Sequence, residues 1–96
     1  MADAAADGRW ELRLPDLGIA DEPLVASLWL VALGATVTEG DRLLEVLAGS
    51  VTVDLPAPAS GQLIEQCVEE DDELHVGQLL AILRVERAER ASSEGA

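Results

Sequence analysis

The sequence predicts an all-β domain, a sandwich or flattened barrel with two-fold pseudo-symmetry, and three features support this. Short strand-like runs are separated by turn-forming residues roughly every 8–12 positions, which is typical of all-β domains. A Gly-Ser pair at positions 49 and 50 joins two of these runs as a hairpin turn would. The stretches 37–46 and 74–83 repeat one pattern of an apolar residue, a glycine and two further apolar residues. Two similar β units can bury their apolar faces against each other.

The length of 96 residues indicates one domain. Residues 1–8 are rich in Ala and Asp, and we expect a disordered N-terminus there. The domain itself is expected over 9–85, followed by a flexible C-terminal tail over 86–96, where the sequence is charged and then rich in Ser and Gly.

The first expected strand is Trp10–Leu14, in which Trp and Leu point inward and alternate with outward Glu and Arg. The Pro-Asp-Leu-Gly sequence at 15–18 then predicts a turn.

The next expected strand, Leu24–Leu33, is apolar on both faces. A helix is the competing interpretation, but the run lacks a good N-cap and simply stops at Gly34. An apolar second face suggests that a chain terminus or a partner covers it, because a strand in a small domain usually has one wet face. One face would carry Val25, Trp29, Val31 and Leu33, and the other Leu24, Leu28 and Leu30.

A hairpin is expected between Leu43–Leu47 and Val51–Leu55, with a type II′ turn whose first central residue is Gly49. Pro56 and Pro58 interrupt the next pairing, since proline has no N–H to donate. Gly61–Val68 and Leu79–Val85 complete the set of expected strands.

Composition excludes several classes of function. Nineteen acidic against 6 basic residues give a net charge of −13, which opposes nucleic-acid binding. The single Cys excludes an internal disulfide and a multi-cysteine metal site, and the single His excludes a multi-histidine site. No signal peptide is visible and no apolar run approaches the roughly 20 residues that span a bilayer, so a soluble cytoplasmic protein is expected. Cys67 is in phase with Leu63, which predicts a buried thiol, and His75 has no partner for catalysis.

Several segments, in order and at matching spacing, resemble the lipoyl and biotinyl carrier domains over roughly residues 10–83. The opening at 14–18 resembles the lipoyl domains of 2-oxo acid dehydrogenase acyltransferases and favours the lipoyl branch. The segments that carry the resemblance are Leu14–Gly18, Trp29–Gly34, Glu45–Val46, Thr52–Pro58, Gly61–Glu70 and Val76–Leu80.

The resemblance implies a flattened barrel of two four-stranded antiparallel sheets, with a carrier lysine at the tip of one hairpin. Ser50 stands at that lysine's position, and Gly49 at the position of the acidic residue before it. All six basic residues are arginines, so these 96 residues contain no lysine to which lipoate or biotin could be joined as an amide. The chain also has Leu28 for a family acid, Ala35 for a family Asp, and Asp71 for a family Gly.

Ser50 is interpreted first as an ordinary turn residue. The alternatives are that it carries another group, such as phosphopantetheine, or that it is phosphorylated or catalytic.

The five acids Glu69, Glu70, Asp71, Asp72 and Glu73 form either a solvated turn or a recognition patch for a basic partner. Their spacing does not match a calcium loop. Leu28 is either a core residue or part of an apolar contact patch with Leu24 and Leu30.

Two functions follow as hypotheses. The first is a non-enzymatic, non-lipoylated docking module whose contact surface is Ala48, Gly49, Ser50 and the acids at 69–73. Its partner would be a thiamine-dependent 2-oxo acid decarboxylase or an acyltransferase, for which it would act as scaffold, regulator or substrate presenter. The second is an acyl carrier modified at Ser50. An enzyme is not expected, because the chain has no nucleophile–base pair.

Overall fold

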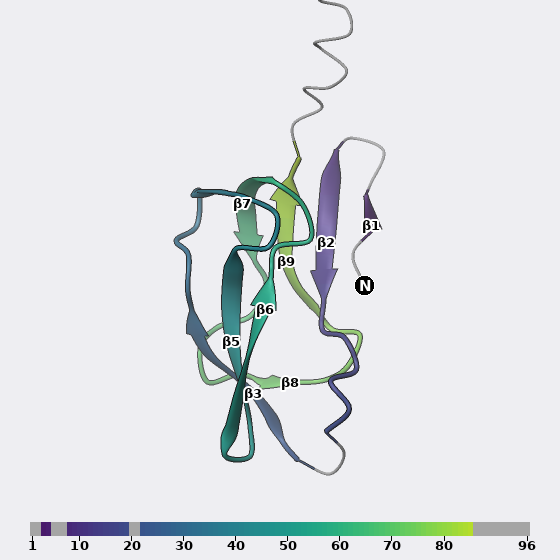
Figure 1. Ribbon diagram of the computed structural model, residues 1–96, viewed down its shortest axis with the longest axis vertical. Helices are drawn as coiled ribbons and strands as arrows, with labels where there is room; N and C mark the ends of the chain where they lie inside the picture. The colour runs from purple at the N-terminus through teal and green to yellow at the C-terminus, as the bar shows by residue number, and fades with distance from the viewer. Residues whose placement is uncertain (1–2, 5–7, 20–21, 86–96) are drawn as a thin grey trace, which may run out of the picture.

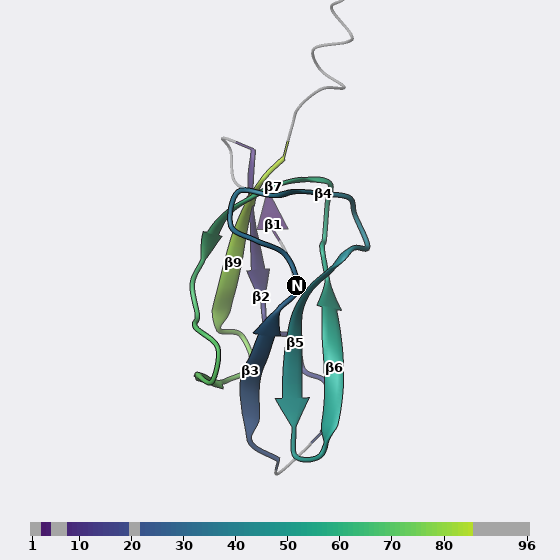
Figure 2. The ribbon, with the colours of Figure 1, turned by 90° about the vertical axis from the view of Figure 1, so that its left-hand side faces the viewer.

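The computed structural model describes residues 3–4, 8–19 and 22–85, in which strands form two antiparallel sheets packed face to face (Figures 1 and 2). One sheet has the order β1-β2-β9-β7-β4 and the other β6-β5-β3-β8. The strands are β1 (Asp3–Ala4), β2 (Arg9–Arg13), β3 (Leu24–Trp29), β4 (Thr36–Val37), β5 (Arg42–Ala48), β6 (Val51–Pro56), β7 (Gly61–Gln66), β8 (Glu73–Leu74) and β9 (Leu79–Arg84). The predicted all-β flattened sandwich is confirmed, with β1 as a fifth strand in one sheet.

The predicted internal repeat is visible in the backbone hydrogen bonds. The Thr38 N–H donates to Asp41 Oδ2 at 2.8 Å, and the His75 N–H donates to Gln78 Oε1 at 2.8 Å in the second half. The same turns are closed by Asp41 N–H to Thr38 O (2.8 Å) and Gln78 N–H to His75 O (2.9 Å). Two halves that close their turns with the same bonds confirm the two-fold pseudo-symmetry.

The core between the sheets is built from aliphatic side chains, as the scarcity of aromatic residues requires. Trp10 and Trp29 are partly buried and pack against this core. The indole Nε1 of Trp29 donates to the Val68 carbonyl at 3.1 Å, so the polar end of the ring is also satisfied. The largest fully buried side chains are Leu14, Leu43, Leu44, Leu63, Leu80, Leu83 and Val46.

The strand expected over Leu24–Leu33 ends at Trp29, and its two faces differ from the prediction. The register against β5 shifts between Ala26 and Leu28, so a bulge at Ser27 reverses the alternation. Ala26 is completely buried on the core side with Trp29, whereas Val25 pairs with Leu47 on the other face. Strict two-residue periodicity cannot anticipate such a bulge.

Cys67 was predicted to be buried, and this is wrong: the thiol is exposed. A second register shift, between Leu63 and Glu65, changes the phase of β7 before the chain reaches Cys67. Val68 therefore takes the buried place, with 4% of its surface exposed. This bulge occupies the position in the second half that the Ser27 bulge occupies in the first.

The expectation of disorder over 1–8 is wrong at Asp3–Ala4, which pair with Glu11 and Trp10 of β2. The C-terminal tail expected at 86–96 lies outside the described residues. In the described part of the chain, no helix is long and apolar enough to cross a membrane.

Candidate functional site

The β5–β6 hairpin ends at the predicted two-residue turn, at the opposite end of the molecule from the end of β9 (Figure 1). Ala48 pairs with Val51, which leaves Gly49 and Ser50 as the loop. Gly49 has φ 64°, while Ser50 is outside the left-handed region, in agreement with a type II′ turn. Ser50 is exposed at the position where the resemblance implies a carrier lysine.

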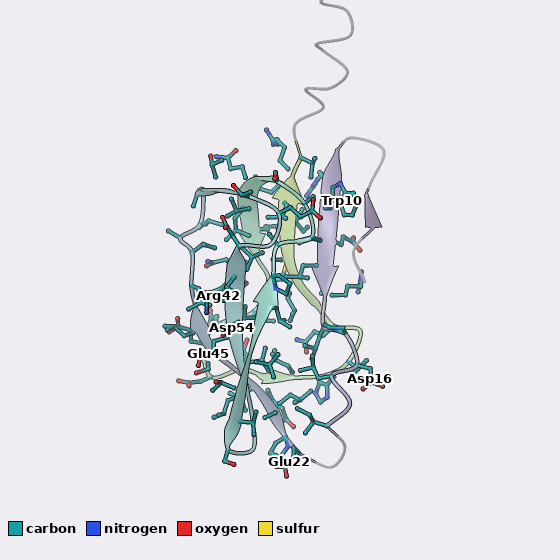
Figure 3. All side chains as sticks on the ribbon, viewed as in Figure 1. Trp10, Asp16, Glu22, Arg42, Glu45 and Asp54 are labelled. Carbon is teal, nitrogen blue, oxygen red and sulfur yellow. The ribbon has the colours of Figure 1, made fainter. Side chains whose placement is uncertain are left out.

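A carboxylate lies against this turn that the sequence did not indicate. A Cβ built on Gly49 would overlap the side chain of Glu22, which comes from the connection between β2 and β3. Figure 3 shows Glu22 at the hairpin end of the molecule. Only the tertiary fold brings this connection to the turn, so no local pattern could have found Glu22.

The acidic loop at 69–73 is exposed, but two of its carboxylates have structural bonds. Glu70 Oε2 accepts a hydrogen bond from the Trp29 N–H at 3.0 Å, just where β3 ends. Asp72 Oδ2 accepts from the Glu69 N–H at 2.8 Å and closes the turn. The loop is therefore part of the framework, and within the described residues the carboxylates of Glu69, Asp71 and Glu73 have no bond of this kind.

The hairpin and the acidic loop flank one strand. Leu24 of β3 pairs with Ala48 of β5 on one side and with Leu74 of β8 on the other. Neighbouring strands lie about 4.8 Å apart, so β5 and β8 are separated by about 10 Å here. The structure thus brings the two predicted contact regions to the same half of the molecule.

Leu28 is 45% exposed, so its interpretation as a core residue is wrong. It lies opposite Glu45 on the outer face of the β6-β5-β3 sheet, where Leu30 is 39% exposed. Leu24, in contrast, packs against the core and does not belong to this surface. The same face carries an ion pair between Arg42 and Asp54, 3.3 Å apart, which sequence reasoning missed (Figure 3).

The remaining candidates lie apart from the hairpin. Partial burial of the Cys67 thiol in this exposed residue raises its pKa, and the negative charges of Glu65 and Glu11 raise it further. His75 serves the turn through its backbone, as described above. Within the described residues, no three His, Cys, Asp or Glu side chains are grouped to hold a metal ion.

Comparison with known proteins decides the family. The profile of the biotin-requiring enzymes, which covers biotin and lipoyl domains, matches residues 10–83. This chain belongs to the biotin–lipoyl domain family. The biotin–lipoyl domain is of the carrier type, and its family normally carries lipoate or biotin.

The curated relatives of this biotin–lipoyl domain show that it is related to the lipoyl domains of acyltransferases. The acetyltransferase component (dihydrolipoyllysine-residue) of the pyruvate dehydrogenase complex from Corynebacterium glutamicum is 32% identical over 93 residues, which is 97% of this chain and 14% of that protein. The component of the same name from Staphylococcus aureus is 34% identical over 86 residues, which is 90% of this chain and 20% of that protein. The chain thus spans about a seventh and a fifth of these two relatives.

Solved structures share the fold of this biotin–lipoyl domain at low sequence identity. A single-chain, multi-domain long-chain acyl-CoA carboxylase matches with a TM-score of 0.67 and 20% identity, over 98% of this chain and 9% of that chain. The glycine cleavage system H protein from Mycobacterium marinum matches with a TM-score of 0.52 and 22% identity, over 99% of this chain and 97% of that one.

Proposed function

We propose that this domain is a docking module that works without a lipoyl or biotinyl group. The observation that carries the proposal is Ser50: it occupies the tip of an intact family hairpin, in 96 residues without a lysine. Lipoate and biotin are joined to a lysine Nε in the domains that this chain resembles. A serine hydroxyl would form a hydrolysable ester instead.

The proposed partner is a thiamine-dependent 2-oxo acid decarboxylase or an acyltransferase, for which the domain acts as scaffold, regulator or substrate presenter. Two relatives are named as components of the pyruvate dehydrogenase complex, which supports a partner of this kind. The small neutral tip can approach another surface at low desolvation cost. The carboxylates of Glu69 and Glu73, in the loop on the other side of β3 from the hairpin, can steer a basic partner into register.

Association kinetics with the decarboxylase of the native host test this function. We expect binding whose on-rate falls as salt rises from low to physiological concentration, because exposed charges are screened beyond about 8–10 Å. The double variant Glu69→Gln/Glu73→Gln should lower the on-rate and its salt dependence while leaving the hydrogen bonds of Glu70 and Asp72 intact.

The matched control is Glu39→Gln/Glu65→Gln, which removes the same charge from exposed positions outside the acidic loop. If both double variants lower the on-rate equally, overall charge steers association and the loop does not. No binding by the wild-type domain, to either the decarboxylase or the acyltransferase, would contradict the docking function.

The outer face around Leu28 offers an alternative contact surface, favoured by its exposure. Binding through this face would depend little on salt, and Leu28→Asp would abolish it. The same kinetic measurement, with Leu28→Ser as a milder variant, separates the two surfaces.

Ser50 also supports a second candidate function, an acyl carrier with phosphopantetheine on its hydroxyl. Its exposure at the tip of the hairpin is the observation in favour. The intact mass of the protein isolated from its native host decides this: an unmodified chain supports docking without an arm, and an added phosphopantetheine supports the carrier.

A further inference from the structure

In the described chain one edge of β6 is unpaired, whereas the equivalent edge of β2, its counterpart in the other half, is paired. Among the described strands, β6 pairs only with β5 and ends its sheet, whereas β2 pairs with β9 on one side and with β1 on the other. Matching bonds relate the two strands: Leu14 N–H to Gln78 O (2.9 Å) after β2, and Ala57 N–H to Asp41 O (2.7 Å) after β6. The fold therefore accepts an added strand at one of two equivalent edges and leaves the other uncovered in the described chain.

The register of the hairpin identifies the groups at this edge. The turn bond joins Ala48 and Val51, and hydrogen-bonded pairs then alternate along an antiparallel ladder. Thr52 and Asp54 stand in the pairs that do not exchange bonds with β5, opposite Leu47 and Glu45. Their N–H and C=O groups consequently point away from β5, towards the open edge that Figure 2 shows beside β6.

This edge has little of the protection usual for exposed strands. The sequence Val-Thr-Val-Asp-Leu at 51–55 favours strand formation, and proline comes only at the last residue of β6. Its single charge, Asp54, is paired with Arg42. Val51 is 54% exposed. An edge of this kind can pair with an extended segment of another chain.

We propose that the β6 edge binds an extended, basic segment of the partner protein as an added antiparallel strand; this rests on the docking function proposed above. The negative charge of the chain indicates which kind of segment binds at the β6 edge. The chain carries a net charge of −13, so a second copy is repelled, and the carboxylates of Glu22 and Glu45 lie at the turn or on the face beside this edge. A segment with alternating basic side chains satisfies both the backbone groups and these carboxylates.

Amide hydrogen exchange on the full chain, followed by NMR, tests the proposal. The probe is the peptide acetyl-VRVRVR-amide, and the matched control is acetyl-VEVEVE-amide. At about ten times the Kd of the basic peptide, exchange at Thr52 and Asp54 should slow about tenfold, since only the unbound fraction exchanges freely. The Val51 and Val53 amides, already paired with β5, should change little.

Two variants tie the protection to the edge. Thr52→Pro removes one outward N–H without touching the bonds to β5, and it should weaken binding of the basic peptide. Thr52→Val keeps that N–H and should bind like the wild type. If Thr52→Pro does not fold, the exchange of the wild-type amides still decides the question.

The proposal is wrong if the basic peptide gives no protection at Thr52 and Asp54, or if the acidic peptide protects them equally. Concentration-dependent protection without any peptide would identify a second copy as the occupant and overturn it as well. If the decarboxylase binds Thr52→Pro and wild type alike while the peptide fails, docking stands and the β6 edge is not its site. If the peptide protects the edge but the decarboxylase does not bind, the docking function fails instead.

Discussion

Gly34 and Asp71 occupy equivalent places in the two halves of the domain and share one backbone conformation. Their φ angles are 92° and 81°, and Asp71 is the only non-glycine residue with positive φ in the described chain. The Gly34 N–H donates to Leu63 O at 2.7 Å, and the Asp71 N–H donates to Ala26 O at 2.6 Å. The second half thus keeps the left-handed turn although its glycine has been replaced.

Substitution of Asp71 should show how much its left-handed backbone conformation costs in folding stability. A side chain in the left-handed region costs about 1–2 kcal/mol, less for Asp, whose short side chain bonds locally. Asp71→Gly is therefore expected to be at least as stable as wild type, and Asp71→Ala about 1 kcal/mol less stable than Asp71→Gly. Urea denaturation of the two variants measures the difference, with Gly34→Ala as the control in the other half. Equal stability of the Ala and Gly variants would contradict the prediction.

Ala35 is the place where the first half has lost a turn-closing side chain. Its equivalent, Asp72, accepts a hydrogen bond from the Glu69 N–H, whereas an alanine offers no acceptor to the Ala32 N–H. Ala35→Asp should therefore stabilise the domain by about 0.5–1.5 kcal/mol, and Asp72→Ala should destabilise it by a similar amount. Ala35→Asn separates the hydrogen bond from the added charge. Thermal denaturation measures the stability of all three variants. If Ala35→Asn is no more stable than the wild type, a side chain at position 35 does not accept a stabilising hydrogen bond from the Ala32 N–H.

Trp29 combines packing with a hydrogen bond, and two variants separate these contributions. Trp29→Phe loses the bond to the Val68 carbonyl but keeps most of the packing, and should cost about 1 kcal/mol. Trp29→Ala should cost about 3 kcal/mol, because the ring packs against the core but is only partly buried. Both costs can be read from urea denaturation. A cost below about 1 kcal/mol for the Ala variant would show that the ring contributes little packing.

Modification of a lysine restored at position 50 should be limited by the conformation of the turn. Wild-type protein co-expressed with a lipoate or biotin ligase should keep its mass, and Ser50→Lys should gain modification only in part. Adding Gly49→Asp should then destabilise the hairpin by about 1–2 kcal/mol, because position 49 has positive φ and a Cβ there would overlap Glu22. Glu22→Ala should relieve part of that cost. Mass spectrometry and thermal denaturation give the two readouts, and lipoate on the wild-type chain would refute the proposed function without a lipoyl group.

Cys67 should react slowly for an exposed thiol. Its pKa is raised by burial first, then by the charges of Glu65 and Glu11, and Arg13 opposes this. A raised pKa means less thiolate at a given pH. The pH at which the rate of alkylation by iodoacetamide reaches half its maximum should therefore lie above that of a free cysteine. Glu65→Gln should move the midpoint down, and Glu39→Gln should leave it unchanged. A pH midpoint below that of free cysteine would contradict the raised pKa of Cys67.

The sequence by itself determined the fold class, the hairpin and the repeat. Turn chemistry is local: a glycine with positive φ before Ser50 defines a type II′ turn wherever the flanking strands alternate. The repeated glycines at 40 and 77 are likewise local signals, and each does have positive φ. The missing lysine, too, is a fact of the sequence that no fold can change.

Only the tertiary structure decided which residues face the core after each bulge, and which groups meet at the hairpin. Val25 and Cys67 were assigned to the wrong faces because one extra residue in a strand reverses every later side chain, and a bulge has no reliable signal in the sequence. Glu22 beside Gly49, Glu70 on the Trp29 N–H and the open edge of β6 all join segments that are distant in the chain. Such contacts depend on how the sheets pack and in what order the strands pair, which periodicity along the chain does not encode.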